Sequence, residues 1–305
     1  MHLVYQATAD DQGHRAVDVL IRRTGMSRLM SKKVRLYGQL TCNGSAHRMV
    51  DPVRAGDVLI AVYLASPDHP AVLNNVPEVL VRYLDDWLLV VSKPAGMVTH
   101  PTYLHETGSL TSSLADYPLH PVNRLDRDTS GLVLIARNGH AHHVIASHPM
   151  QKTYLGLVHG RMSGLSGMIE LPIRRSEGSI MLREVHPDGV EARTKWRQLR
   201  YFERSNISLL QFELLTGRTH QIRVHCQATG CPLVGDSLYG WLADLERAAT
   251  PDCELDRQIR RQALHAASLS FAHPISGQIM RLTAPLPEDF RSLLNTLYQL
   301  ERTIV

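Results

Sequence analysis

Apolar and polar positions between residues 15 and 64 follow a helical repeat first and a strand-like one afterwards. Apolar residues at 17, 20 and 21 have helical spacing, and Gly25 then ends the helix. Ser27 is a suitable N-cap for a second helix over 28–37, which Gly38 closes. Short apolar runs at 40–42 and 58–64, each next to a turn sequence, predict a strand pair. This segment is therefore expected to form a small α/β module.

The rest of the chain is dominated by strand-like runs. A stretch rich in Pro, Asn and Ser at 66–77 has the composition of a linker, so a boundary is expected near residue 75, dividing the chain into 1–75 and 76–305. The runs typical of strands are 79–83, 88–92, 131–137, 153–159, 208–214, 264–271 and 279–283. Helical patterns are confined to 219–228 and 288–300. Many strands with few helices predict an α+β domain built on a largely antiparallel mixed β-sheet with flanking helices.

Composition adds a broad class. The 305 residues are 44% apolar and 20% charged, which is enough for a sizeable core and argues against extensive disorder. The four cysteines are too few and too scattered for a disulfide framework. The N-terminal residues include no apolar targeting segment, and no run approaches 18 uncharged apolar residues, so a cytoplasmic location and no membrane association are expected.

Positive charge is concentrated in the small module. Residues 15–58 carry nine basic and three acidic side chains, whereas the whole chain has a net charge of only +4. Arg28, Lys32 and Arg35 fall on one face of the second predicted helix, with Lys33 beside them. Such a concentration is the electrostatic signature of a polyanion-binding surface, and a basic face that is merely solvated is the alternative.

The densest polar cluster lies at 120–131, immediately before the apolar run 132–136. A charged loop that leads into a buried strand places its side chains at the rim of a sheet, where sites are commonly built. A salt-bridged turn would give the same pattern. The 17 histidines also raise the question of a metal, but the closest group of candidate ligands has none of the spacings of a zinc site. That group is His220, His225, Cys226 and Cys231.

The cluster resembles the signature of RluA-type RNA pseudouridine synthases. The core of the match is Arg124-Leu125-Asp126 followed by Thr129-Ser130-Gly131. The resemblance extends in the family's order over roughly residues 85 to 290, through segments at 93–101, 152–154, 215–225, 235–240, 264–266 and 271–274. The basic N-terminal segment resembles the S4 RNA-binding module, on Ser27-Arg28, the basic helix, the Asn43-Gly44 turn and Gly56-Asp57. Together these imply a pseudouridine synthase fold preceded by an S4-like module.

The resemblance implies roles for individual residues. Asp126 matches the family's catalytic aspartate, which is needed in its ionised form whether it attacks ribose C1′, adds to uracil C6 or removes the C2′ proton. Arg218 matches as the partner that keeps this carboxylate charged and oriented. Tyr154 matches the tyrosine that lies against the target base, with a core tyrosine as the alternative.

Further residues are expected to bind the substrate. Arg124 would serve base extrusion, because a cation entering the vacated space offsets part of the cost of unstacking. Leu125, Leu215 and Ile222 would wall the base pocket. His100, Thr99 and Lys93 are candidates for backbone contacts, or else ordinary polar residues at strand ends. The histidine-rich segment 139–150 departs from the family pattern, and a shortened helix is expected there.

Uridine isomerisation is redox-neutral, so neither a cofactor nor a metal is expected, and no phosphate-binding glycine motif appears. The predicted partner is RNA, with large-subunit ribosomal RNA first and transfer RNA second, and no obligatory protein partner is implied. Two other functions stay open. One is a non-catalytic RNA-binding or ribosome-assembly protein, and the other is a nucleoside hydrolase that uses Asp128 as a second carboxylate.

Overall fold

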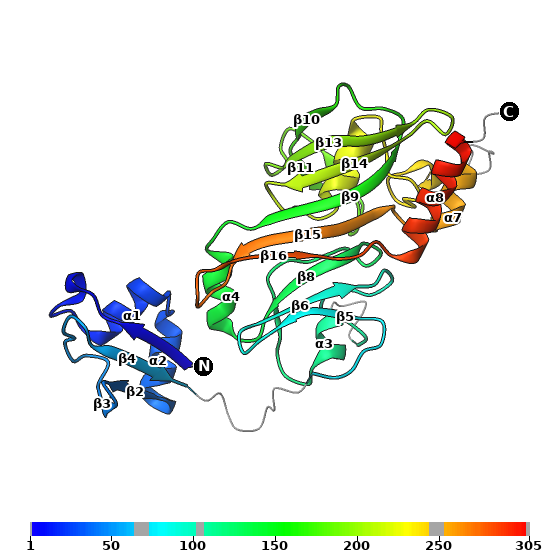
Figure 1. The fold of residues 1–305 in the computed structure, drawn as a ribbon. Coiled ribbons are helices and arrows are strands. Elements are labelled where there is room, and N and C mark those ends of the chain that lie inside the picture. Colours follow the sequence, from blue (N-terminus) through cyan, green and yellow to red (C-terminus); the bar gives the residue numbers. More distant parts are fainter. Residues whose placement is uncertain (1, 64–72, 102–106, 244–252, 303–305) are drawn as a thin grey trace.

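The computed structural model describes residues 2–63, 73–101, 107–243 and 253–302 (Figure 1). Its small N-terminal part is a four-stranded sheet in the order β1-β4-β2-β3, with two helices. The strands are β1 (His2–Gln6), β2 (Gln39–Cys42), β3 (Ser45–Ala46) and β4 (Val58–Val62), and the helices are α1 (Ala16–Thr24) and α2 (Arg28–Tyr37), after the short turn η1 (Ala9–Asp11). The two predicted helices are present, and the sheet includes the predicted strand pair together with β1, which the sequence pattern did not predict.

Local sequence accounts for the helix ends in this part. The Ser27 side chain accepts a hydrogen bond from the amide of Met30, which caps α2. Gly25 ends α1 with φ of 67°, a left-handed conformation that glycine adopts without strain. Buried apolar residues from both helices and the sheet form a core of their own, and Trp87 packs against this core and also against a core of the larger part. Residues 66–72 of the predicted linker lie outside the described residues, whereas Leu73 and Val76 pack on the core of the larger part.

The larger part is built on a ten-stranded mixed sheet, counted within the described residues, in the order β10-β13-β14-β9-β15-β8-β6-β5, with β16 beside β15 and β7 beside β8. Neighbouring strands are antiparallel, except that β15 and β8 are parallel. The strands are β5 (Leu80–Leu84), β6 (Leu88–Lys93), β7 (His120–Pro121), β8 (Ser130–Ala136), β9 (Gln151–His159), β10 (Ser166–Glu170), β13 (Arg193–Phe202), β14 (Ile207–Leu214), β15 (Leu264–Ala272) and β16 (Ile279–Thr283). This is the predicted α+β class.

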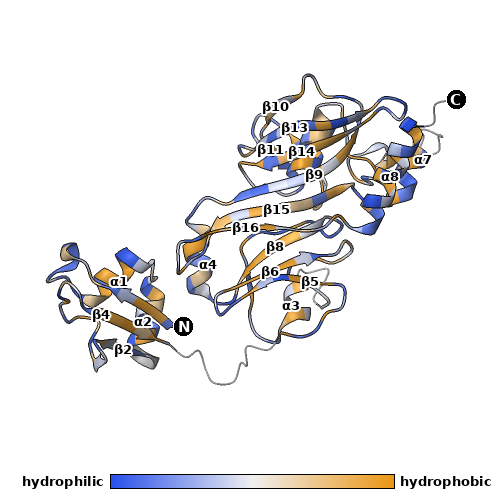
Figure 2. Ribbon diagram, in the orientation of Figure 1, coloured by the Kyte–Doolittle hydropathy of each residue, from blue (hydrophilic) through white to orange (hydrophobic). Residues whose placement is uncertain are grey.

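Helices cover both faces of the sheet. One face packs against α3 (Leu110–Leu114) and α5 (Gln221–Ala228). The other packs against α4 (Gly139–Ala146) and α8 (Glu288–Arg302), with α7 (Glu254–Ile259) beside α8. A separate hairpin of β11 (Ile173–Arg175) and β12 (Arg183–Val185) precedes β13, and the short turn η2 (Trp241–Ala243) follows α5. Strands β6 and β8 are buried on both faces, and Figure 2 shows hydrophobic colouring along both.

The parallel contact between β8 and β15 depends on a glycine. Gly131 pairs with Ala266 and has φ of 115°, and a Cβ atom at Gly131 would collide with the backbone of Ala266. This close approach brings the loop that ends at Thr129 against β15. The expected histidine-rich helix is present as α4, which has eight residues. None of the helices in the described ranges is long and apolar enough to span a bilayer.

Candidate active site

Asp126 lies in the loop between β7 and β8, and buried side chains fix that loop on both sides of it. The Thr99 hydroxyl accepts from the amide of Leu125 at 3.1 Å and donates to its carbonyl at 3.0 Å. The buried ammonium of Lys93 donates to the carbonyl of Arg127 at 2.9 Å and to two carbonyls of its own segment. Burial lowers the pKa of Lys93 to about 7, against the opposing charges of Asp128 and Asp126. The backbone of Asp126 is therefore held at both neighbouring residues.

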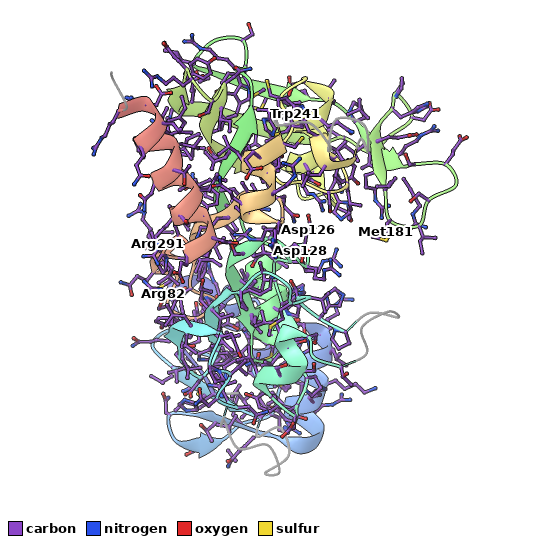
Figure 3. All side chains as sticks on the ribbon, turned by 90° about the vertical axis from the view of Figure 1, so that its right-hand side faces the viewer. Arg82, Asp126, Asp128, Met181, Trp241 and Arg291 are labelled. Carbon is purple, nitrogen blue, oxygen red and sulfur yellow. The ribbon has the colours of Figure 1, made fainter. Side chains whose placement is uncertain are left out.

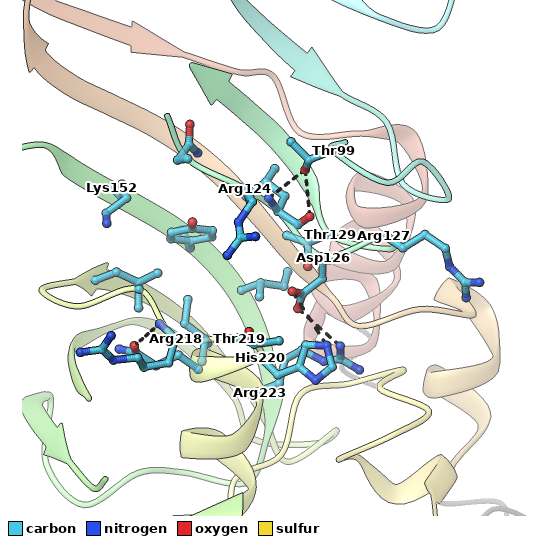
Figure 4. Close-up of a pocket in the computed structure, with 18 of the residues that line it drawn as sticks. Thr99, Arg124, Asp126, Arg127, Thr129, Lys152, Arg218, Thr219, His220 and Arg223 are labelled. Atoms are coloured by element: carbon cyan, nitrogen blue, oxygen red, sulfur yellow. Dashed lines mark hydrogen bonds and ion pairs between the residues drawn. The ribbon is translucent and has the colours of Figure 1, made fainter. Parts of the chain in front are cut away.

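The Asp126 carboxylate opens on a cavity of about 480 Å³ on the face of the sheet that carries α3 and α5 (Figure 4). A quarter of its side-chain surface is exposed. A smaller cavity, of about 210 Å³, is also lined by Asp126. Both cavities share Asp126, Arg127, His220 and Arg223. In Figure 3 Asp126 and Asp128 lie near the middle of the molecule, and Met181, which lines the smaller cavity, lies on the hairpin that projects from it.

The cation beside Asp126 is Arg223. Its Nη1 atom lies 3.4 Å from Oδ2 of Asp126. The same guanidinium is bidentate to the buried Asp236, at 2.7 Å from Nε and 2.8 Å from Nη2, and it lies over the ring of Tyr239 at 5.0 Å. Burial lowers the pKa of Arg223, but the carboxylates of Asp236 and Asp126 outweigh it, so the pKa is raised and the group stays charged.

Arg218 occupies a different place from the one that the sequence implied. Its Nε donates to the backbone carbonyl of Glu191 at 2.9 Å, and its side chain is exposed at the edge of the larger cavity. The expected pairing of Arg218 with Asp126 is therefore corrected to Arg223. No signal in the sequence separates the two arginines, because Arg223 lies only five positions after Arg218 in the same motif.

Tyr154 lies on β9 with its side chain 5% exposed in the wall of the larger cavity. Burial raises the pKa of its phenol, and the charge of Asp126 adds to this, so the hydroxyl stays protonated at neutral pH. Lys152 is two residues earlier on the same strand and lines the same cavity, as strand alternation requires. Burial lowers the pKa of Lys152. No role was expected for Lys152, although its spacing from Tyr154 places both side chains on the same face of a strand.

Most of the predicted substrate-binding residues line the larger cavity. Leu125 and Ile222 are buried in its wall, Arg124 is exposed at it, and His100 lines it as well. Burial lowers the pKa of His100, and the charge of Arg124 adds to this effect. Leu215 was expected in the wall, but it is 46% exposed, and Leu214 takes the place instead. A one-residue error along a strand moves a side chain to the opposite face.

The two histidines among the candidate metal ligands, His220 and His225, have other hydrogen-bond partners. His225 uses both ring nitrogens, with the Thr194 hydroxyl and the Leu171 carbonyl each at 2.9 Å. Across the described residues, no three His, Cys, Asp or Glu side chains gather in a way that could hold a metal ion. Asp128, the candidate second carboxylate, accepts hydrogen bonds from the guanidinium of Arg127.

Comparison with known proteins identifies the chain. A family model described as RNA pseudouridylate synthase matches residues 87–228. An uncharacterized RNA pseudouridine synthase of Bacillus subtilis, YjbO, is 34% identical over 271 residues, which cover 84% of this chain and 90% of that protein. The chain belongs to the RNA pseudouridine synthase family. It is accordingly an isomerase that modifies RNA.

A further relative and two solved structures are also similar to this RNA pseudouridine synthase. The ribosomal large subunit pseudouridine synthase D of Xanthomonas campestris is 36% identical over 274 residues, which cover 85% of this chain and 81% of that protein. The solved structures of human RNA pseudouridylate synthase domain containing 4 and 1 superpose with TM-scores of 0.54, at 22% and 23% identity. The superposed regions cover 72% and 76% of this chain, and 93% and 97% of the two human chains. This likeness establishes the pseudouridine synthase fold.

Proposed function

We propose that this enzyme isomerises uridine in large-subunit ribosomal RNA, with Asp126 as its catalytic carboxylate. The observation that carries the proposal is the position of the Asp126 carboxylate, which opens on the larger cavity with Arg223 behind it and Tyr154 in the wall. Uridine isomerisation breaks the C1′–N1 bond and rejoins the base through C5. It therefore needs one group that reacts with the nucleoside and one enclosure that retains the detached uracil.

The larger cavity supplies the enclosure. Its apolar walls come from Leu125, Leu214 and Ile222, and the Tyr154 ring offers a surface for a base. Base–aromatic stacking contributes about 1–3 kcal/mol per base. A target base in a helix or a stacked loop must first leave the stack, at a cost of a few kcal/mol. Arg124, exposed at this cavity, is placed to fill the vacated space and offset part of that cost.

Arg223 places a positive charge beside the partly buried carboxylate of Asp126. Asp236 binds two nitrogens of the Arg223 guanidinium, and the third faces Asp126. Because the guanidinium is already fixed, it does not have to reorganise during the reaction. An ionised carboxylate is required by all three routes for the first step, namely attack at C1′, addition at C6 and proton removal at C2′. The three routes share these residues.

The N-terminal part is proposed to act as an S4-like RNA-binding module. Arg28, Lys32 and Arg35 are exposed on α2, and Lys33 is half-buried with its ammonium 5.8 Å from the centre of the Tyr63 ring. The charge of Lys33 also lowers the pKa of His120, after burial and the neighbouring His142. Since His120 begins the segment that leads to Arg124, RNA bound along α2 would lie close to the catalytic loop.

The proposed target rests on a relative, because the Xanthomonas campestris protein is named as a large-subunit enzyme. The test is to map pseudouridines in total RNA from cells with and without the gene, and to restore it as wild type or as Asp126→Asn. We expect specific sites in large-subunit ribosomal RNA to disappear, to return with the wild type and to stay absent with Asp126→Asn. If sites disappeared from transfer RNA alone, the target would be transfer RNA and not ribosomal RNA.

A second measurement checks the reaction itself. Purified enzyme incubated with the target RNA should form pseudouridine without releasing uracil. Free uracil as the main product would make the protein a nucleoside hydrolase instead. Full activity of Asp126→Asn would remove the carboxylate from the mechanism, because that substitution keeps the size of the side chain and removes its charge.

A further inference from the structure

His220 has contacts that the chemistry described so far does not use. Its Nδ1 atom lies 2.8 Å from the hydroxyl oxygen of Tyr239, and its Nε2 atom lies 4.0 Å from Oδ1 of Asp126 (Figure 4). The His220 and Tyr239 rings meet edge to face, with centres 5.5 Å apart. His220 lines both cavities, as do Asp126 and Arg223.

The hydrogen bonds around Tyr239 indicate which nitrogen of His220 carries a proton. The Tyr239 hydroxyl accepts from the backbone amide of Arg183 at 2.8 Å, which leaves its own proton for Nδ1 of His220. Burial lowers the pKa of His220, and this outweighs the opposing charge of Asp126, so the ring is neutral at pH 7. A neutral imidazole that accepts at Nδ1 carries its proton on Nε2. That proton faces Asp126.

The backbone of His220 is a second, independent observation. The residue lies immediately before α5 with φ of 57° and ψ of 18°, in the left-handed region. A side chain is disfavoured there, and glycine would adopt this conformation without strain. Three other non-glycine residues in the described ranges have positive φ, namely Asn43, Asn206 and Arg260, and all three are exposed, whereas His220 is half-buried. Retaining a strained imidazole beside a reactive carboxylate points to a use for its side chain.

We propose that His220, oriented by Tyr239, is a positioning residue that holds Oδ1 of Asp126 while Arg223 holds Oδ2. With a donor facing each oxygen, rotation of the carboxylate group is restricted from both sides. The present separation of 4.0 Å is longer than a hydrogen bond, and a movement of about 1 Å on substrate binding would close it, as is common for active-site hydrogen bonds. The proposal rests on Asp126 being the catalytic carboxylate.

The test compares His220→Gly, His220→Gln and Tyr239→Phe in the full-length enzyme, with single-turnover rate, RNA affinity and thermal midpoint as readouts. We expect His220→Gly to slow the chemical step by about 10- to 100-fold, as is typical when the support of a catalytic group is removed. RNA affinity should stay within about twofold, because the basic face of α2 and the ring of Tyr154, which are proposed to bind RNA, are unaltered. The thermal midpoint should stay within about 3 °C, because relief of backbone strain offsets the lost ring contacts.

The conservative variants separate positioning from packing. Gln can present an amide donor near the place of Nε2, so His220→Gln should recover at least part of the rate that His220→Gly loses. Tyr239→Phe removes the hydroxyl that orients the ring and should slow the chemical step by about tenfold. Tyr201→Phe is the matched control, because that hydroxyl also has one side-chain partner, Asn206 at 2.9 Å, on the exposed surface. Its rate should be that of the wild type.

Asp126→Asn is included so that the two proposals can fail separately. Wild-type rates for His220→Gly and Tyr239→Phe, beside an inactive Asp126→Asn, would overturn the role of His220 and leave the proposed function in place. An active Asp126→Asn would overturn both. A His220→Gly protein that does not fold leaves the decision to Tyr239→Phe and His220→Gln, and wild-type rates for these two would also overturn the inference.

Discussion

The Nη1 atom of Arg223 lies 3.4 Å from Oδ2 of Asp126, while the other side of the same guanidinium is bound to Asp236 at 2.7 and 2.8 Å. Asp236 is fully buried, and Arg223 is 4% exposed. The planar fork of arginine can satisfy one carboxylate with two nitrogens and still present a third to another. The arginine that contacts Asp126 is thus held in place by a second carboxylate, that of Asp236.

Arg223→Lys is expected to impair turnover far more than Arg218→Lys. A lysine ammonium cannot bind Asp236 at two points and reach Asp126 as well, so one of the two carboxylates loses its partner. We expect the rate of the chemical step to fall by about 100-fold or more for Arg223→Lys, which is the size seen when one preorganised donor is removed from an active site. Arg218→Lys keeps a positive charge at the exposed edge of the cavity, and its effect should be mainly on RNA affinity.

Single-turnover rates at saturating enzyme measure the chemical step, and RNA titrations measure affinity. Circular dichroism at equal protein concentration controls for folding, because Arg223 is buried. The opposite order, with Arg218→Lys inactive and Arg223→Lys close to wild type, would return Arg218 to the role that the sequence pattern first implied for it.

The sequence predicted the strands of the central sheet well where they are apolar and less well elsewhere. Runs such as 88–92 and 131–137 are buried on both faces and therefore stand out, and they appear as β6 and β8. Strand β13 (Arg193–Phe202) was not predicted, because its outward residues at 193, 195 and 197 are basic and its inward face includes the polar residues Thr194 and Gln198. Strand β10 and the hairpin of β11 and β12 are short and largely exposed, so they give little apolar signal.

For the candidate site too, the sequence located some residues and could not locate others. Motif spacing located Asp126 and Tyr154, which line one cavity in the folded chain. The choice between Arg218 and Arg223 could not be made from sequence, because both lie within six residues of one motif, and only the position of α5 decides which one reaches Asp126. Leu214 and Leu215 present the same difficulty, since the register at the end of β14 sets which of them faces the cavity.

Tyr154→Phe and Tyr154→Ala are expected to differ in RNA binding. Phenylalanine keeps an aromatic face for the extruded base, whereas alanine removes a stacking contribution of about 1–3 kcal/mol, so affinity for the target RNA should fall by about tenfold for alanine alone. Affinity is measured by titration, and the amount of pseudouridine formed in one turnover is measured on the same RNA. Any loss of turnover in Tyr154→Phe then reports the contribution of the hydroxyl. Equal, near-normal behaviour of both variants would make Tyr154 a core residue only.

The exposed basic face of α2 is expected to contribute to RNA affinity through electrostatics. Replacing Arg28, Lys32 and Arg35 by Gln should make the slope of log affinity against log salt shallower by roughly 2–3 units, since each phosphate contact contributes slightly less than one unit. The rate of the chemical step at saturating enzyme should be unchanged. Replacing the exposed Arg281, Arg291 and Arg302 by Gln is the charge-matched control. Identical slopes for the two triple variants would show that the α2 face is merely solvated.

His140 is expected to make the stability of this protein depend on pH. It is 1% exposed beside Trp87, and in the part of the chain that the structure describes neither of its ring nitrogens has a hydrogen-bond partner. Burial, with a smaller effect from His143, lowers its pKa from 6.5 to about 4. The unfolded chain therefore binds this proton first as pH falls, so the free energy of unfolding should fall between pH 6.5 and 4, by about 2–3 kcal/mol.

His140→Phe should remove most of this dependence. Phenylalanine keeps a ring of similar size against Trp87 and cannot be protonated, so the variant should lose less stability than the wild type when pH is lowered from 7 to 4.5. The measurement is the urea midpoint at both pH values, and the difference between wild type and variant at pH 4.5 should exceed that at pH 7. His143→Phe, at an exposed position of the same helix, is the matched control and should follow the wild type.

Since His265 is also buried, with a pKa lowered to about 4, some acid sensitivity should persist in His140→Phe. If the urea midpoint changed with pH by the same amount in wild type and His140→Phe, His140 would be either already protonated or not buried in the folded protein.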